Sequence, residues 1–123
     1  MNSKKILLVE DDNFLLAMYN TKLLLENFKV ITATTGVQAL RLVTKEKPDL
    51  ILLDLNLPEM DGFEVLANLK HDKETSNIPV IVLTNYSQKE HIDKCFALGA
   101  ADYLIKAHFV PAEVVDKIKK ILV

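Results

Sequence analysis

Three carboxylates in a row follow a short aliphatic run near the start of the chain. The run Ile6–Val9 is followed, without a spacer, by Glu10, Asp11 and Asp12. Like charges at this spacing repel one another, and burying any of them costs free energy unless a positive group lies beside it. Either these side chains simply point into water, or a cation belongs among them.

Other polar residues also follow aliphatic runs. Asp54 comes after Leu50–Leu53, and Thr84 and Lys106 end or follow two later runs. A carboxylate cluster without cysteine or a nearby histidine suits a hard divalent cation, and Mg²⁺ fits best. A lysine and a hydroxyl suit a phosphoryl group. Together these residue types favour transfer of a phosphoryl group to a carboxylate, with the metal ion neutralising charge between them.

The elements that must position these residues alternate regularly along the chain. Short apolar runs, each predicting a strand, are followed by segments with helical spacing of apolar residues. The predicted strands are Lys5–Val9, Val30–Ala33, Leu50–Leu53, Pro79–Leu83 and Tyr103–Ile105. The predicted helices are Phe14–Glu26 with Asn13 as N-cap, Val37–Lys45, Phe63–Lys70, Glu90–Leu98 and a last helix from Pro111.

This alternation predicts a doubly wound (βα)5 sandwich of three layers, flavodoxin-like, with a parallel five-stranded sheet of order 2-1-3-4-5. The middle strands are continuous aliphatic runs, as a parallel sheet covered on both faces requires. Five units are too few for a barrel, so the sheet is open. In that strand order the ends that carry Glu10, Asp54, Thr84 and Lys106 share one edge, where sites form in such folds. We expect a single domain over residues 1–123, with no output domain.

Composition narrows the function classes. The 123 residues include 15 basic and 17 acidic ones, a net charge of −2, which argues against direct nucleic-acid binding through phosphates. Cys95 is the only cysteine, so no disulfide frame exists, and we expect it to pack on the fourth helix. No apolar run approaches membrane-spanning length, and we expect a cytoplasmic protein. The histidines, His71, His91 and His108, show no metal-ligand spacing and are interpreted as surface residues.

Four motifs, VEDD, LLDLNLPEMDG, VLTN and ADYLIKA, occur in this order and span nearly the whole chain. In this combination the chain resembles the receiver domain of two-component response regulators, of the single-domain, chemotaxis-regulator-like kind. The resemblance implies that Asp54 accepts a phosphoryl group and that Thr84 and Lys106 bind its oxygens. It also implies that Tyr103 is an aromatic switch residue that reorients when Thr84 moves toward the phosphate.

The resemblance further implies a Mg²⁺ site, at which Mn²⁺ could substitute. Asp11 and Asp54 would ligate the ion, Glu10 would contribute, often through water, and the backbone carbonyl of Asn56 would complete the protein ligands. Asp12 is as well explained by its place at the start of the first helix, where a negative charge is favourable.

The implied partners are proteins. The phosphoryl donor would be a histidine kinase or a histidine phosphotransfer protein, and the chain would catalyse only its own phosphorylation and dephosphorylation. Phosphorylation would switch a surface formed by the fourth helix, fifth strand and fifth helix, to which a downstream protein target binds. No membrane or direct nucleic-acid contact is implied, and we expect a monomer or weak dimer.

Two positions depart from the family pattern. Ala107 follows the lysine where proline is usual, often with a cis bond, so we predict a trans Lys106–Ala107 bond, since cis costs about 3–4 kcal/mol without proline. Asn85 directly follows Thr84, where the family often has a small residue, and Tyr86 comes next. They could narrow access to Asp54, so we predict slower hydrolysis of the phosphorylated form than with small residues there.

Two alternatives stay open at this point. The chain could be a small aspartate-dependent phosphatase, although that class typically has a second acid two positions after the nucleophile, and here the residue is Asn56. It could also be a phosphorylation-independent, receiver-like interaction scaffold. The complete set of Asp11, Asp54, Thr84 and Lys106 argues against the scaffold.

Overall fold

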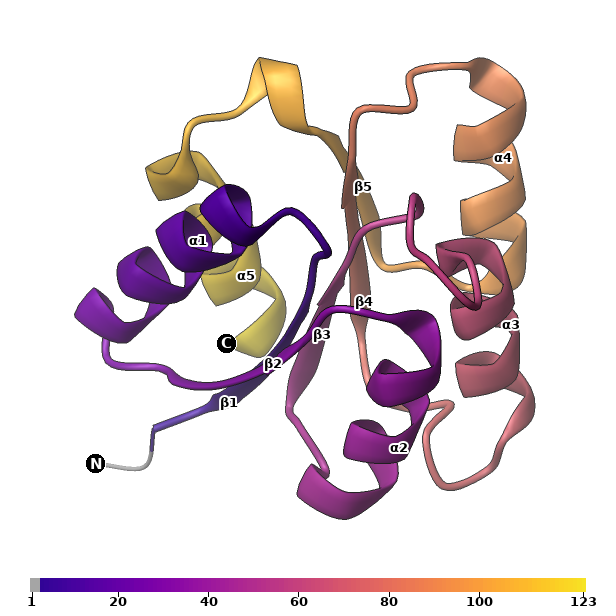
Figure 1. The fold of residues 1–123 in the computed structure, drawn as a ribbon, viewed down its shortest axis with the longest axis horizontal. Coiled ribbons are helices and arrows are strands. Elements are labelled where there is room, and N and C mark those ends of the chain that lie inside the picture. Colours follow the sequence, from indigo (N-terminus) through magenta and orange to yellow (C-terminus); the bar gives the residue numbers. More distant parts are fainter. Residues whose placement is uncertain (1–2) are drawn as a thin grey trace.

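Five parallel strands form the centre of the computed structural model, which describes residues 3–123 (Figure 1). Their order across the sheet is β2-β1-β3-β4-β5, as predicted from the sequence. The strands are β1 Lys5–Val9, β2 Lys29–Ala33, β3 Leu50–Leu53, β4 Val80–Thr84 and β5 Asp102–Ile105. All neighbouring strands pair in parallel, so every connection must cross the sheet, and helices provide these crossings.

Helices cover both faces of the sheet (Figure 1). The helices are α1 Asn13–Leu25, α2 Gly36–Glu46, α3 Gly62–His71, α4 Lys89–Leu98 and α5 Pro111–Leu122, and a 3₁₀ turn, η1, spans Lys106–His108. Helices α1 and α5 lie on one face, and α2, α3 and α4 lie on the other. Within residues 3–123, no helix has both the length and the hydrophobicity that crossing a lipid bilayer requires.

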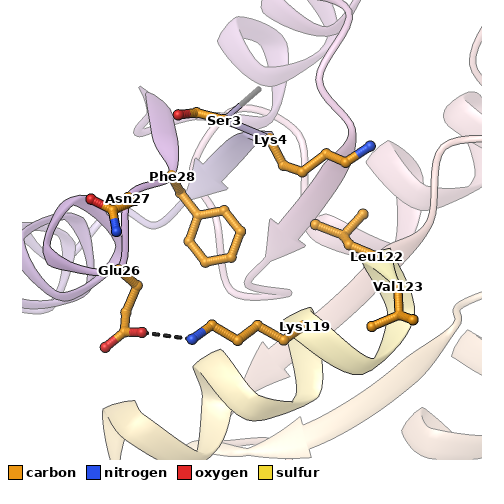
Figure 2. A pocket seen from close by; sticks show the side chains of 8 residues that line it. All are labelled: Ser3, Lys4, Glu26, Asn27, Phe28, Lys119, Leu122 and Val123. Atoms are coloured by element: carbon orange, nitrogen blue, oxygen red, sulfur yellow. Dashed lines mark hydrogen bonds and ion pairs between the residues drawn. The ribbon is translucent and has the colours of Figure 1, made fainter. Parts of the chain in front are cut away.

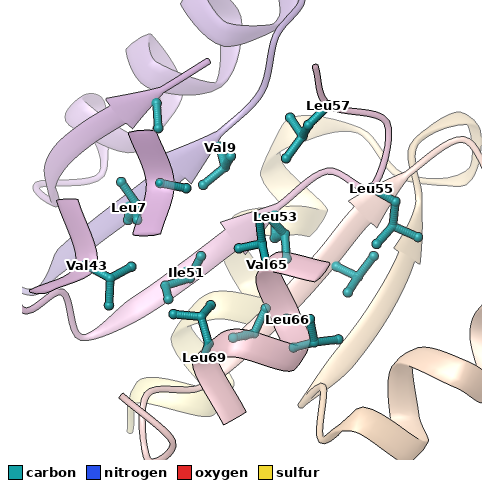
Figure 3. Packing of buried hydrophobic residues seen from close by; sticks show 14 of the residues in the cluster. Leu7, Val9, Val43, Ile51, Leu53, Leu55, Leu57, Val65, Leu66 and Leu69 are labelled. Carbon is teal, nitrogen blue, oxygen red and sulfur yellow. The ribbon is translucent and has the colours of Figure 1, made fainter. Parts of the chain in front are cut away.

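The apolar core is divided by the sheet into two clusters. On the side of α2, α3 and α4, strand residues such as Leu7 and Ile51 pack against Val65 and Leu69 of α3 (Figure 3). On the other side, residues of β1, β3 and β4 pack against Tyr19 and Leu23 of α1 and the apolar face of α5. Each central strand is therefore buried on both faces, which explains its uninterrupted aliphatic sequence.

Most helix and strand boundaries lie within one residue of those predicted. The N-cap of α1 and a 3₁₀ turn differ from the prediction, whereas the peptide bond after Lys106 agrees with it. Asp12, not Asn13, is the N-cap of α1: its side chain accepts the backbone N–H of Leu15 at 2.9 Å, and Asn13 is the first helical residue. The 3₁₀ turn after β5 was not predicted. As predicted, the Lys106–Ala107 bond is trans, like the other peptide bonds of the described residues.

The register of the strands determines which residues leave the sheet next to one another at its carboxyl edge. Val9 of β1 pairs with Leu53 of β3, and the Asp54 N–H donates to the Val9 carbonyl at 3.1 Å. The next residues, Glu10 and Asp54, therefore leave the sheet side by side. At the other side of β3, Thr84 pairs with Ile105, which places Lys106 at the same edge.

Gly62, the first residue of α3, lies tightly against the chain segment that carries Asp54. A Cβ at this position would lie 2.4 Å from the Asp54 carbonyl oxygen and 2.5 Å from the Leu55 Cα, and both atoms belong to the backbone. Because backbone cannot move aside as a flexible side chain can, we expect Gly62→Ala to lower the free energy of unfolding by about 1–3 kcal/mol. Urea denaturation measures the change.

Asn68→Ala on the exposed side of the same helix is the matched control. We expect it to change stability by less than about 0.5 kcal/mol. Equal stabilities for Gly62→Ala and the wild type would show that the contact between α3 and the Asp54 segment is not tight.

Candidate functional site

A cavity of about 470 Å³ opens at the carboxyl edge of the sheet, where the sequence predicts the site. It brings together residues from the ends of β1, β3, β4 and β5. The lining residues are Glu10, Asp11, Asp12, Leu15, Asp54, Asn56, Thr84, Asn85, Tyr86 and Lys106. Every predicted phosphoryl-binding and metal-binding residue is among them, whereas Tyr103 is not.

The three carboxylates of the predicted metal site lie close together. One oxygen from each of Glu10, Asp11 and Asp54 can be chosen so that all three lie within 4.8 Å of one another. Glu10 and Asp54 are only 3% and 5% exposed, whereas Asp11 is exposed. An all-oxygen set with one ligand open to solvent fits Mg²⁺, which keeps several of its water ligands in protein sites.

Lys106 neutralises part of this negative charge. Its Nζ lies 2.5 Å from Glu10 Oε1 and 2.9 Å from Asp54 Oδ2, and the lysine side chain is only 10% exposed. Burial lowers the pKa of Lys106, but the hydrogen bonds and charges of Glu10 and Asp54 outweigh burial and raise that pKa above its usual value. The ammonium group is therefore fully charged at neutral pH and links the ends of β1, β3 and β5.

The carboxyl pKa of Glu10 is raised above its usual value. Burial raises the pKa of its carboxyl, and the charge of Asp54 adds to this, while the Lys106 hydrogen bond and the Asp12 N–H oppose it. The Asp12 N–H donates to Glu10 Oε2 at 3.1 Å. Two donors therefore hold Glu10 in place, yet its carboxyl pKa stays above the usual value because burial disfavours the charged form.

The three adjacent acids differ in their environments. Asp12 is exposed and its side chain is engaged as the N-cap of α1, so its place at the cavity is explained by the helix that it begins. Asp11 is exposed without this engagement, and Glu10 is buried.

A chain of hydrogen bonds joins Thr84 to Tyr103 through the backbone of Tyr86. The Tyr86 N–H donates to Thr84 Oγ1 at 3.4 Å, and the Tyr103 hydroxyl donates to the Tyr86 carbonyl at 2.6 Å. Burial raises the pKa of Tyr103 to about 12, so its hydroxyl remains a donor at neutral pH. A movement of Thr84 that shifts the Tyr86 backbone would therefore change the hydrogen bond of the Tyr103 hydroxyl.

Nothing in the sequence indicates that the backbone of Tyr86 joins Thr84 to Tyr103. His71 and His108 are exposed and His91 is partly exposed, in keeping with their interpretation as surface residues, and the His91 ring centroid lies 5.1 Å from that of Tyr86. What the sequence did not predict is that His91 contacts the rings of Phe63 and Tyr86. Cys95 is buried on α4, as predicted.

A second cavity, of about 690 Å³, lies near the other end of α1 and α5 (Figure 2). Phe28 and Leu122 give it apolar walls, and Lys119 Nζ lies 2.7 Å from Glu26 Oε1 at its edge. It is the larger of the two cavities, but it gathers no cluster of carboxylates from the described residues. The smaller cavity, which holds the carboxylate cluster with Thr84 and Lys106, is therefore the candidate functional site.

Comparison with known proteins gives a consistent result. The family described as response regulator receiver domain matches residues 6–119. Sporulation initiation phosphotransferase F of Bacillus subtilis is 38% identical over 122 residues, which cover 99% of this chain and 96% of that protein. The transcriptional regulatory protein PrrA of Mycobacterium tuberculosis is also 38% identical, but the chain spans only 51% of its length.

Solved structures agree in fold. A CheY-like response regulator receiver domain protein from Methanospirillum hungatei has a TM-score of 0.91 at 30% identity, covering 98% of this chain and 94% of that one. The receiver domain of a sensor histidine kinase from Pseudomonas aeruginosa has a TM-score of 0.87 at 28% identity, covering 97% of both chains. It was solved with a magnesium ion coordinated in its active-site cleft.

Proposed function

We propose that Asp54 is the phosphorylation site of this chain, which belongs to the response regulator receiver domain family. The chain is a phospho-accepting component of a two-component signalling system. The observation that supports Asp54 is its setting: a nearly buried carboxylate at the carboxyl edge of the sheet, 2.9 Å from a lysine and beside two further acids. Receiver domains exchange phosphoryl groups with histidine kinases or phosphotransfer proteins, so the donor is a phosphohistidine.

The residues of the cavity divide the work of this transfer. A carboxylate oxygen of Asp54 attacks phosphorus while the bond from phosphorus to the donor's imidazole nitrogen breaks, and the histidine keeps that electron pair. Lys106 is placed to pair with a phosphoryl oxygen. Thr84 accepts the Tyr86 N–H with its oxygen, which leaves its hydroxyl hydrogen to donate to another phosphoryl oxygen.

A divalent cation, Mg²⁺ or Mn²⁺, would be held by Glu10, Asp11 and Asp54, with Asn56 at the same cavity. When bound, it would offset the repulsion between the incoming phosphoryl group and these carboxylates. The protein itself keeps these three carboxylates together. Because Val9 pairs with Leu53, the residues that follow β1, Glu10 and Asp11, lie beside Asp54, which follows β3.

Mg²⁺ is therefore expected to raise the melting temperature of the protein by mass action, because it binds the folded state. Asp11→Ala should abolish this rise. Since Asp11 is exposed, its loss removes a ligand without disturbing the core. Differential scanning fluorimetry over a Mg²⁺ series measures both proteins.

Asp12→Ala is the matched control, because it removes the neighbouring acid. It should lower the starting melting temperature through loss of the helix cap, yet keep the rise with Mg²⁺. A rise that persists in Asp11→Ala would place the ion elsewhere.

The signalling output extends from this site. The hydrogen bonds from Thr84 through Tyr86 to Tyr103 support a switch role for Tyr103, and Tyr103 lies on β5, within the α4-β5-α5 face that we propose for the downstream protein. The single-domain organisation, the monomer or weak dimer and the cytoplasmic location remain predictions, as does the slow hydrolysis expected from Asn85 and Tyr86.

One experiment separates the switch from its alternatives. The protein is incubated with Mg²⁺ and acetyl phosphate, and its intact mass is followed; beryllium fluoride is tested in parallel. A switch gains the mass of one phosphoryl group and returns slowly to its starting mass. No modification and no response to beryllium fluoride would favour the scaffold, and rapid turnover of a small phosphate ester would favour the phosphatase.

A further inference from the structure

The half-buried ring of His91, in the first turn of α4, lies between two aromatic rings. Its centroid is 5.1 Å from that of Tyr86 and 5.4 Å from that of Phe63, with interplanar angles of 38° and 48°. Both centroid distances lie within the range of about 4.5–7 Å over which aromatic rings attract one another. His91 therefore connects the loop after β4, which carries Tyr86, to the first turn of α3, which carries Phe63.

Two further contacts hold these three rings: one to His91 and one to Phe63. His91 Nδ1 lies 3.2 Å from Gln88 Oε1, at the residue that precedes α4. Lys94, on the same helix as His91, places its Nζ 4.5 Å from the centroid of the Phe63 ring, a favourable distance for a cation and an aromatic face. The imidazole thus has a defined place rather than a choice of exposed rotamers.

Tyr86 is the residue through which these rings reach the site. It lines the cavity with Asp54, its N–H donates to Thr84, and its carbonyl accepts the Tyr103 hydroxyl. Its backbone is thereby tied to the two proposed switch residues, while its side chain is tied to His91. The loop between β4 and α4 is exposed on either side of Tyr86, at Asn85 and Ser87, so these ties are what keep it at the rim of the cavity.

We propose that His91 is a positioning residue that holds Tyr86 at the rim of the Asp54 cavity and thereby slows hydrolysis of the phosphorylated aspartate. The inference rests on the proposed role of Asp54. In that hydrolysis a water oxygen attacks phosphorus, the bond between phosphorus and the Asp54 oxygen breaks, and the electron pair returns to the carboxylate. The water protons leave with inorganic phosphate. Holding Tyr86 in place restricts the approach of this water.

The test compares the decay of phosphorylated variants by intact mass after acetyl phosphate is removed. His91→Ala should decay roughly three- to tenfold faster than the wild type, the change expected when one aromatic contact is lost. His91→Phe keeps a ring between Tyr86 and Phe63 and should restore slow decay. His71→Ala, at the exposed end of α3, is the control and should decay at the wild-type rate.

A double variant tests the path through Tyr86. In a Tyr86→Ala background, where the ring that His91 holds is absent, adding His91→Ala should give no further acceleration. Circular dichroism checks that each variant folds. His91→Leu, which keeps the apolar bulk without the ring, should also decay faster, and it carries the test if His91→Ala does not fold.

The outcomes separate this inference from the function on which it rests. Wild-type protein that takes up no phosphoryl group would overturn both. Normal uptake, with wild-type decay in the folded His91→Ala or His91→Leu variant, would overturn the positioning role alone. Independent, additive effects of His91→Ala and Tyr86→Ala would also overturn it, because His91 would then act without Tyr86.

Discussion

Asp54→Asn is expected to abolish phosphorylation of the protein completely. The amide has no carboxylate oxygen to form the mixed anhydride, while its shape and its hydrogen bond to the Asn56 N–H can be kept. With Mg²⁺ and acetyl phosphate, or with a phosphorylated partner kinase, intact mass spectrometry should show one added phosphoryl group on the wild type and none on the variant.

Asp12→Asn is the matched control for this experiment. It makes the same change of charge at the same cavity, and asparagine caps a helix about as well as aspartate does. We expect it to be phosphorylated like the wild type. Phosphorylation of Asp54→Asn to the wild-type extent would place the acceptor at another residue.

The second large effect is expected at Lys106. Replacing it by methionine leaves Glu10 and Asp54 buried without their shared ammonium partner, at side-chain exposures of 3% and 7%. Removing one partner of a buried ion pair typically costs about 3–5 kcal/mol. We therefore expect Lys106→Met to lose about 3 kcal/mol of unfolding free energy at neutral pH without Mg²⁺, as measured by urea denaturation.

The loss should depend on pH with a definite sign. The pKa of Glu10 is already raised by burial, and without Lys106 it should rise further. The folded variant then takes up protons before the unfolded chain does, so its deficit is full above the raised pKa. The deficit should shrink as the pH falls toward the usual carboxyl value of about 4. Mg²⁺ should also shrink it, by replacing the missing positive charge.

Lys119→Met is the control for the lost ion pair. Lys119 pairs with Glu26 at 2.7 Å, but its side chain is 51% exposed. Solvent screens such a pair, so a much smaller loss is expected. Equal losses for the two variants, or a Lys106→Met deficit that does not change with pH, would show that Lys106 does not stabilise the buried carboxylates.

Much of the fold follows from the sequence because its strongest signals are local runs that only one kind of tertiary setting accepts. Leu50–Leu53 is an aliphatic run that only a doubly covered strand accommodates, and it was predicted to the residue. The N-cap of α1 was missed by one residue because Asp12 and Asn13 are equally good caps. Only the extended backbone of Asp12 decides between them. The 3₁₀ turn at Lys106–His108 is too short to produce any periodicity.

The sequence predicts which residues lie at the site, but it does not predict which of their side chains contact one another. Strand order predicts that Glu10, Asp54 and Lys106 share an edge, whereas the pairing of Lys106 with both acids depends on strand register and side-chain length. The place of His91 depends on how α3 and α4 lie against each other, and no pattern within α4 reports that.

The ion pair between Lys106 and Glu10 also has a consequence for folding kinetics. It joins residues 96 positions apart in the chain, and it can form only when β5 has docked beside β4 at one side of the sheet. Contacts that close such long loops are costly to form early, so this one should be largely absent from the folding transition state. Substitution of Lys106 should therefore mainly raise the unfolding rate and leave the folding rate nearly unchanged, so this lysine contributes to the kinetic stability of the native protein.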